Sequence, residues 1–159
     1  MADLLPDQLR LMAGTHPDEV AFVDVSTGTE LTFGDWERGS NQIGRHLVGL
    51  GVERGDRVAV LVPPGEPERF LLAYAAVHKA GAVAVPTSTR LVAPELVHVL
   101  GHSGAVVAIS GAASTATLQA AWPDLPALRH VVTTAPPTGD ERVLPWSTLL
   151  GGDDAEFQR

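Results

Sequence analysis

The stretch that decides the fold is RVAVLVPPGEPERFLLAYAAVHKAGAVAVP, residues 57–86. Its first six residues form a short, valine-rich apolar run, which is typical of a strand buried on both faces of a sheet. Pro67 suits the first turn of a helix that we expect to run to about Ala80. The inner side of that helix is expected to carry Phe70, Leu71, Tyr74 and Val77. Gly81 can end the helix, and residues 82–86 are expected to form the next strand.

The same unit recurs downstream. Pro94 begins a further predicted helix that Gly104 ends, and residues 105–109 follow as a third strand. A short helix capped by Ser114 and a fourth strand at residues 130–133 complete the pattern. Repeated alternation of strand and helix predicts an α/β fold with a mostly parallel sheet and right-handed crossover helices.

An N-terminal helix and a β-hairpin are expected before the sheet. Residues 20–25 and 30–33 are apolar runs around a glycine-containing turn, which predicts the hairpin. Gly14 is placed to end a helix whose apolar face carries Leu5, Leu9 and Met12. Thr32 is placed to cap a second helix, which Gly51 can end. Its buried stripe is expected to comprise Phe33, Trp36, Ile43, Leu47 and Leu50.

Composition limits the possible functions. The chain has 159 residues, of which 45% are hydrophobic and 19% are charged, as in one globular domain or most of one. The formal net charge is −8 and no basic stripe is present, which argues against a nucleic-acid partner. Cysteine is absent, which excludes disulfides and thiolate metal sites and fits the cytoplasm. The N-terminus lacks a signal-peptide pattern, and no apolar run approaches the roughly 20 residues that cross a bilayer.

Three short motifs are explained without a catalytic or binding site. Residues 49–55 contain three glycines but follow a predicted helix and precede a strand, the reverse of a dinucleotide-binding loop. Ser103 lacks the preceding strand, and the glycine two positions later, that a nucleophile elbow needs. His98 and His102 are four residues apart on a predicted helix and could share zinc with a third ligand. Their apolar neighbours claim the inner face, so we expect both histidines to face solvent.

Lys79 is the only lysine of the chain and falls in the last turn of its predicted helix. The carboxyl end of the helix dipole stabilises a cation there, which accounts for Lys79 without a catalytic role. Trp36 and Tyr74 are interpreted as core residues rather than as a stack for a ligand. The chain has no glycine-rich loop ending in lysine and no matched base and nucleophile. We therefore predict no catalytic, cofactor-binding or metal-binding residue within it.

Five segments, in order, resemble the adenylate-forming enzymes, which comprise AMP-dependent acyl-CoA synthetases, peptide-synthetase adenylation domains and luciferases. They are HPDEVAF at 16–22, LTFGDW at 31–36, LGVERGDRVA at 50–59, HKAGAVAVP at 78–86 and HSGA at 102–105. The fourth is the most specific, because it is similar to the Lys-Ala-Gly-Ala-x-x-x-Pro core of the family. Arg90-Leu91 resembles the pair that often follows, whereas Ser88-Thr89 replaces the usual Asn-Pro, so the loop shape there is expected to differ.

The resemblance implies part of the large N-terminal domain of these enzymes, with residues 1–134 as a partial α/β subdomain and 135–159 as a loop-rich tail. The whole enzyme would activate a carboxylic acid, in the first instance a fatty acid, with ATP and Mg²⁺ and pass the acyl group to coenzyme A. The family's Ser/Thr- and Gly-rich loop ending in Lys would follow Arg159, and no catalytic residue of the family falls on this chain. We therefore expect the chain alone to be inactive and to bind none of these cofactors tightly, with the remainder of the synthetase or a partner chain completing it.

Two alternatives stay open. The chain can be a stand-alone, non-catalytic binding module derived from the same fold, docking to another polypeptide through the surface that the rest of the domain would cover. It can also belong to the adenylation domain of a peptide synthetase, in which case a carrier-protein thiol replaces coenzyme A. The Lys-Ala-Gly-Ala run and Arg90-Leu91 are more similar to the fatty-acid branch.

Overall fold

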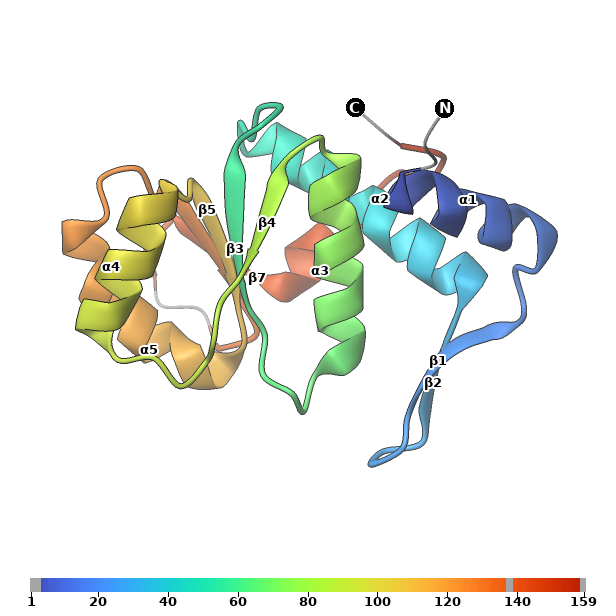
Figure 1. The fold of residues 1–159 in the computed structure, drawn as a ribbon, viewed down its shortest axis with the longest axis horizontal. Helices are drawn as coiled ribbons and strands as arrows, with labels where there is room; N and C mark the ends of the chain where they lie inside the picture. Colours follow the sequence, from blue (N-terminus) through green and yellow to red (C-terminus); the bar gives the residue numbers. More distant parts are fainter. Residues whose placement is uncertain (1–3, 137–138, 158–159) are drawn as a thin grey trace.

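A parallel sheet forms the middle layer of the chain (Figure 1). The computed structural model describes residues 4–136 and 139–157, so Pro137 and both chain ends lie outside the described residues. The sheet strands follow one another in the order β4-β3-β5-β6-β7, and every neighbouring pair is parallel. Their bounds are β3 (Arg57–Leu61), β4 (Val83–Pro86), β5 (Val107–Ser110), β6 (His130–Thr133) and β7 (Val143–Pro145). The α/β fold with a parallel sheet, expected from the sequence, is confirmed.

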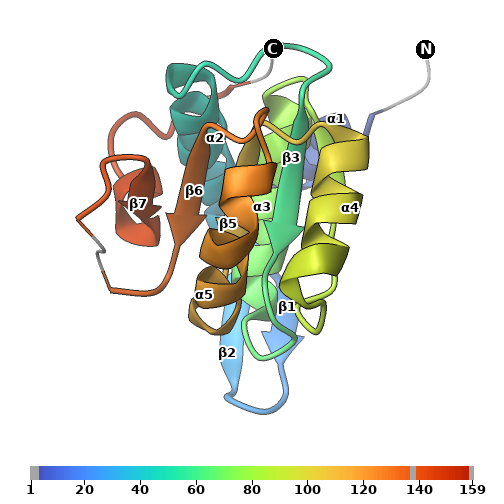
Figure 2. The ribbon, with the colours of Figure 1, turned by 90° about the vertical axis from the view of Figure 1, so that its left-hand side faces the viewer.

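Helices cover both faces of this sheet. On one face lie α2 (Phe33–Gly49) and α3 (Pro67–Lys79), and on the other lie α4 (Ala93–Ser103) and α5 (Ala112–Ala121), as Figure 2 shows. The helix α1 (Leu5–Thr15) packs outside α2 and α3. Two short 3₁₀ helices complete the described elements, η1 (Trp122–Asp124) after α5 and η2 (Trp146–Leu149) after β7.

Strand β3 shows why a valine-rich run belongs at the centre. Val58 and Val60 point into the core beneath α2 and α3, whereas Ala59 and Leu61 point into the core beneath α4 and α5. All four side chains are buried, because successive residues of a strand point to opposite faces and helices cover both faces of this sheet. Strand β4 lies at the edge of the sheet, and its Val83 is half exposed.

The local signals that begin and end the helices act largely as expected. The Thr32 hydroxyl accepts a hydrogen bond from the backbone N–H of Asp35 at 3.1 Å and so caps α2. Gly81 and Gly104 adopt positive φ angles of 72° and 64° immediately after α3 and α4, a conformation that favours glycine. The hairpin also forms, with β1 (Val20–Asp24) antiparallel to β2 (Thr29–Thr32).

Two expected helix boundaries are wrong. Helix α1 continues through Gly14 to Thr15, whose hydroxyl donates back to the Leu11 carbonyl at 2.8 Å. Helix α5 begins at Ala112, so Ser114 lies within its first turn and does not cap it. In both cases the residue that was expected to mark a boundary lies inside the helix.

The expected inner face of α3 is only partly correct: Val77 is fully buried, and Phe70 packs against the core while partly exposed. Its buried side chains include Leu72, Ala73 and Ala76 together with Val77, whereas Phe70, Leu71 and Tyr74 are only partly buried. Small alanines face the sheet and α2 because α3 packs against both, and close packing leaves no room for rings there. The large apolar side chains instead occupy the outer flank of the helix.

The segment expected to be a loop-rich tail contains a strand. β7 adds to the sheet through only three residue pairs, Val131 with Val143, Val132 with Leu144 and Thr133 with Pro145. Trp146 and Leu149 of η2 then return to the core beneath α2. The proposed division of the chain at residue 134 stays a prediction.

The close approach of Gly111 to the loop after β3 yields a test of this packing. A Cβ atom added at Gly111 would lie 2.3 Å from Cδ of Pro63, so we expect Gly111→Ala to lower the free energy of unfolding by about 1–3 kcal/mol. Gly101→Ala in α4 is the matched control, since its Cβ would meet only Leu125 at 3.9 Å and should stabilise by about 0.5–1 kcal/mol. Denaturant unfolding of both variants measures the difference, and equal stabilities would contradict the packing at Gly111.

Candidate functional site

The side on which successive strands join the sheet changes at β3. The next strand, β4, lies on one side of β3, and the following strand, β5, lies on the other. Ligands of open α/β sheets bind outside the carboxyl ends of the strands at such a switch point. The carboxyl end of β3 leads into Pro63 and Glu66, and that of β5 into Gly111, so these residues mark where a site is to be sought.

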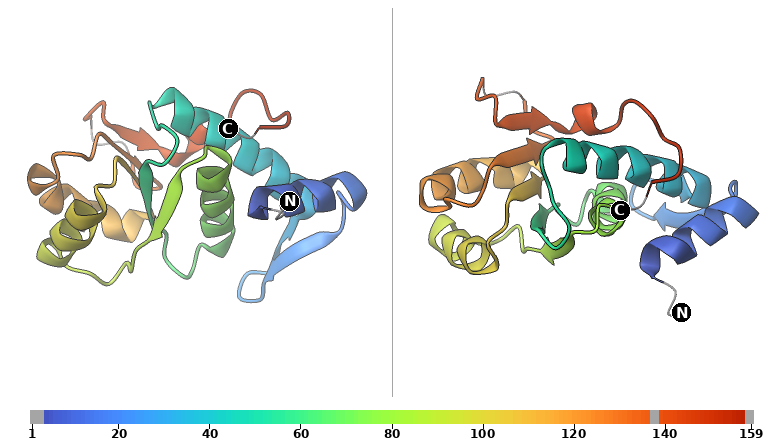
Figure 3. Two further views of the ribbon diagram at one scale, coloured as in Figure 1. Left: turned by 45° about the horizontal axis from the view of Figure 1, so that its top comes forward. Right: turned by 90° about the horizontal axis from the view of Figure 1, so that it is seen from above.

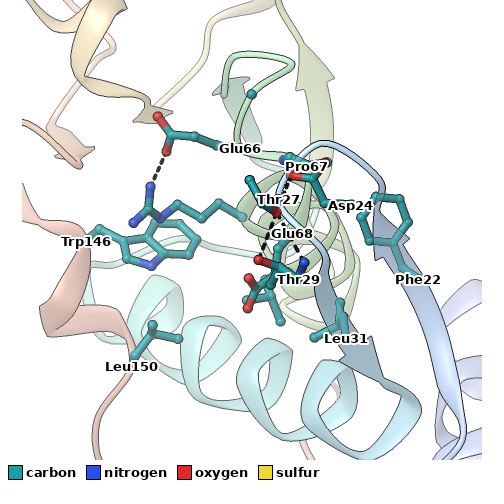
Figure 4. Close-up of a pocket in the computed structure, with 13 residues that line it drawn as sticks. Phe22, Asp24, Thr27, Thr29, Leu31, Glu66, Pro67, Glu68, Trp146 and Leu150 are labelled. Atoms are coloured by element: carbon teal, nitrogen blue, oxygen red, sulfur yellow. Dashed lines mark hydrogen bonds and ion pairs between the residues drawn. The ribbon is translucent and has the colours of Figure 1, made fainter.

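A hollow of about 340 Å³ lies near this edge, between the hairpin, the start of α3 and η2 (Figure 4). Apolar side chains from the hairpin and from η2 form two of its walls, namely Phe22, Leu31 and Trp146. Acidic side chains dominate its polar lining: Asp24 from β1, and Glu66 and Glu68 from the start of α3. Arg69 is the basic residue among the lining side chains.

The charged groups of this hollow are largely engaged by their own neighbours. The Asp24 carboxylate accepts from the Ser26 hydroxyl at 2.7 Å, the Ser26 N–H at 2.9 Å and the Thr27 hydroxyl at 3.0 Å, and these bonds lower the pKa of Asp24. Arg69 forms an ion pair with Glu66. Glu68 lies in the first turn of α3, where the helix dipole favours a negative charge. The hollow therefore offers net negative charge and no base paired with a nucleophile.

A cluster of hydroxyl groups lies at the carboxyl ends of β5 and β6. Thr115 Oγ1 lies 2.5 Å from Thr133 Oγ1 and 3.3 Å from Ser110 Oγ, and all three residues are buried. Thr134 Oγ1 accepts from the N–H of Ala112 at 2.8 Å at the start of α5. These hydroxyls satisfy one another and the backbone, an arrangement that holds the start of α5 against the ends of β5 and β6. Sequence reasoning missed this cluster, whose only signal was a Ser or Thr closing each strand.

Lys79 occupies a different environment from the one expected. It lies in the last turn of α3 as predicted, but it is fully buried and its Nζ lies 2.6 Å from Oε2 of Glu37 in α2. Its Nζ also donates to Asn41 Oδ1 at 2.6 Å and to the Glu37 carbonyl at 3.2 Å. Burial lowers the pKa of Lys79, and Glu37 opposes that shift. The explanation by the helix dipole alone is therefore wrong, because a buried ion pair between α2 and α3 holds this charge.

The other singled-out residues lie where a structural role places them. His98 and His102 are exposed on α4 with their rings 6.2 Å apart, so the expectation that they face solvent is confirmed. Within residues 4–136 and 139–157, no group of three or more His, Asp and Glu side chains is arranged to hold a metal. The Ser103 hydroxyl donates to the Leu100 carbonyl at 3.1 Å in the last turn of α4. Gly51 and Gly55, with φ angles of 80° and 85°, form the helix end and turn expected before β3.

An aromatic row runs along the outer flank of α3. Tyr74 lies between Phe70, whose ring centroid is 5.7 Å away, and His78, at 4.7 Å. Burial lowers the pKa of His78. Trp36 of α2 is partly buried, and its Nε1 donates to the Leu71 carbonyl at 3.0 Å. Trp36 thus links α2 to α3, whereas Tyr74 packs between two rings of α3 itself.

A second hollow, of about 460 Å³, lies on the α5 side of the molecule and includes Trp122 and Arg142. The Arg142 guanidinium lies 4.5 Å from the Trp122 ring and donates to both carboxylate oxygens of Asp140, at 2.8 Å and 3.1 Å. These bonds lower the pKa of Asp140 to about 2.

In the described part of the chain, no helix combines the length and apolarity needed to cross a membrane.

Comparison with known proteins gives a consistent match. The family model described as AMP-binding enzyme matches residues 9–154. The long-chain-fatty-acid–CoA ligase FadD13 of Mycobacterium tuberculosis is 41% identical over 112 residues, which cover 70% of this chain and 22% of that protein. Triostin synthetase I of Streptomyces triostinicus is 31% identical over 160 residues, covering 100% of this chain and 28% of that protein. The chain therefore spans only 22% to 28% of the length of these curated relatives.

Solved structures agree with the sequence relatives. The anthranilate CoA ligase AuaEII, solved in complex with anthranoyl-AMP, matches with a TM-score of 0.81 at 26% identity, over 91% of this chain and 27% of that one. The inhibitor-bound N-terminal domain of FACL13 from Mycobacterium tuberculosis matches with a TM-score of 0.77 at 29% identity, over 93% of this chain and 34% of that one.

The buried ion pair predicts a large effect of a single substitution. Lys79→Met leaves the Glu37 carboxylate without its partner, so we expect the free energy of unfolding to fall by about 3–5 kcal/mol. The double variant Glu37→Leu with Lys79→Met removes both charges and should recover most of that loss. Arg38→Ala, which breaks an exposed ion pair with Asp35, is the control and should cost about 0–1 kcal/mol. Denaturant unfolding measures all three, and a loss under 1 kcal/mol for Lys79→Met would contradict the buried pair.

Two histidines predict how stability changes with pH. Burial lowers the pKa of His78 and of His130 below the ordinary value of 6.5, and Arg129 and Arg142 add to the shift at His130. Below pH 6.5 the unfolded chain takes up protons that the folded chain resists, so stability should fall as the pH drops from 6.5 toward the folded pKa values. Above that window these groups contribute no slope.

His78→Gln and His130→Gln should each flatten this loss of stability, measured as the denaturant midpoint at several pH values between 7.5 and 5. His102→Gln, on the exposed side of α4, is the matched substitution. An unchanged slope in both the His78→Gln and His130→Gln variants would show that other groups control the acid response.

Proposed function

The chain belongs to the AMP-binding enzyme family, and on this premise we propose that it forms the N-terminal scaffold of an acyl-CoA ligase. The observation that carries the proposal is the family match over residues 9–154, together with 41% identity to a long-chain-fatty-acid–CoA ligase. In the proposed reaction a carboxylate, preferably that of a fatty acid, attacks the α-phosphorus of ATP, and pyrophosphate leaves. The thiol of coenzyme A then attacks the acyl carbon, forming the thioester and releasing AMP.

The residues of this chain do not fit the nucleotide. Phosphoryl transfer needs positioned cations and backbone donors around a charge-rich transition state. The hollow at the carboxyl edge of the sheet carries Asp24, Glu66 and Glu68, and its arginine is already paired with Glu66. Lys79 is buried against Glu37 and cannot reach a ligand. We therefore propose that groups outside residues 1–159 bind ATP, Mg²⁺ and coenzyme A and carry out the chemical steps.

A supporting role remains for these residues. The sheet and its four flanking helices can position the rest of a longer domain, since this chain matches only 27% of the solved anthranilate CoA ligase. We place the protein in the cytoplasm, because a chain without cysteine needs no oxidising compartment.

A second candidate differs in the acceptor. Triostin synthetase I is similar to this chain over its whole length, at 31% identity, which favours an adenylation domain of a peptide synthetase as the alternative. In that case the acyl group would pass to the thiol of a carrier protein. The two candidates share the first half-reaction and diverge at the second.

The test uses the complete reading frame that encodes these residues, produced as one polypeptide. We expect ATP–pyrophosphate exchange that depends on added carboxylic acid, with long-chain fatty acids among the best substrates, followed by thioester formation with coenzyme A. Transfer to a carrier-protein thiol in place of coenzyme A would favour the peptide-synthetase alternative. No exchange with a panel of fatty, aromatic and amino acids would overturn the ligase proposal.

The 159-residue chain alone is the control. We expect it to show no exchange above background, since we propose that the phosphate-binding groups lie outside it. Acid-dependent exchange by this chain would show that the catalytic groups lie within it. If light scattering instead shows the chain in a stable complex with another protein from its source, the stand-alone binding module gains support.

A further inference from the structure

The last described residues lie along α2. Residues 151–157, which we call the strap, leave η2 and run beside α2 toward α1, as the view from above in Figure 3 shows. Most of their contacts with α2 are made through backbone carbonyls. Gln42 Nε2 donates to the Gly152 carbonyl at 3.4 Å, and Arg45 donates to the Ala155 and Glu156 carbonyls at 3.1 Å and 3.3 Å. Successive polar side chains of α2 thus hold the strap by its main chain.

Packing and charge add to these hydrogen bonds. The Phe157 ring lies against Gly44 so closely that a Cβ at residue 44 would come within 2.9 Å of it. The Arg45 guanidinium lies 4.9 Å from the centroid of the same ring, and Arg10 of α1 pairs with Glu156 at 3.2 Å. The strap therefore contacts α2 and α1 through ring packing, a cation–π contact and an ion pair as well as through hydrogen bonds.

Asn41 joins the strap to the buried ion pair. Its Nδ2 donates to the Asp154 carbonyl at 3.1 Å, and its Oδ1 accepts from Lys79 at 2.6 Å. A lysine can only donate and a carbonyl can only accept, so the two ends of the amide are assigned without ambiguity. The same side chain thus contacts the strap on one side and the core of the α2–α3 contact on the other.

We propose that Asn41 is a positioning residue that couples docking of the strap on α2 to the Lys79–Glu37 pair. The pair holds Oδ1, which fixes the plane of the amide and aims Nδ2 at the strap carbonyl. The direction in which the chain leaves the described domain at residue 157 is then set from the interface between α2 and α3. This inference rests on contacts of this chain and does not depend on the ligase activity.

Only asparagine meets both requirements with this reach. Aspartate keeps an acceptor for Lys79 but turns a carboxylate oxygen toward the Asp154 carbonyl, so it should release the strap and retain the pair. Leucine would leave Lys79 with one acceptor fewer and the strap carbonyl without a donor. Asn41→Asp is therefore the substitution that separates the two functions of the residue.

Limited proteolysis of the 159-residue chain with chymotrypsin, followed by mass spectrometry, tests the proposal, because cleavage after Phe157 requires its ring to leave Gly44. We expect Asn41→Asp to raise the rate of this cleavage at least about tenfold while the chain stays folded. Gly44→Ala, which displaces Phe157, is a positive control that should release the strap by a separate route. An unchanged cleavage rate in Asn41→Asp would overturn the positioning role.

A second variant in the same experiment changes only the Lys79–Glu37 ion pair. The double variant Glu37→Leu with Lys79→Met removes no hydrogen bond or ion pair made to the strap, yet it frees Oδ1 of Asn41. Coupling predicts that the rate of chymotryptic cleavage after Phe157 rises several-fold in this variant at matched global stability. A rate within a factor of about two of the parent chain would show that the strap docks independently and would overturn the coupling. If the double variant fails to fold, Glu37→Gln with Lys79→Met, which also removes both charges and frees Oδ1 of Asn41, gives the same comparison.

Discussion

The burial of β3 on both faces is the constraint from which the other layers take their places. Its side chains alternate between two cores, so helices must cover both sides of the sheet, and its neighbours on either side must be strands. The side on which successive strands are added changes at β3, since β4 takes one flank and β5 the other. The edge that results collects the loops after β3, β5 and β6, where the hollow and the hydroxyl cluster lie.

Sequence pattern predicts those parts of the fold whose cause is local. Strands at 57–61 and 130–133 are predictable from continuous apolar runs, and Gly81 and Gly104 end helices because they tolerate positive φ. The buried side of α3 is not predictable in this way, because the helix carries apolar residues on every side and packing selects its alanines. β7 escapes notice because three paired residues between prolines and glycines leave almost no periodic signal.

The groups around the candidate site were harder to foresee, for a physical reason. The hollow draws its lining from the hairpin, the start of α3 and η2, segments that only tertiary packing brings together. The partner of Lys79 lies 42 residues away in the sequence, and a lysine near the end of a helix is already explained by the helix dipole. Sequence resemblance nevertheless indicated the family, because the order of the motifs can be read from the sequence even though the contacts between them cannot. The motifs LTFGDW and HKAGAVAVP open α2 and close α3, and the structure shows that these helices share one buried polar cluster.

The burial of Lys79 also affects how the chain meets chemical reagents and modifying enzymes. Every other basic side chain in the sequence is an arginine or a histidine, so the folded surface presents no lysine amine. Acylating reagents, lysine acetylation and lysine-specific proteolysis can reach the side chain only when α2 and α3 separate. The rate at which Lys79 is labelled therefore reports how often the interface between α2 and α3 opens. It can be measured in the natural chain without introducing a probe.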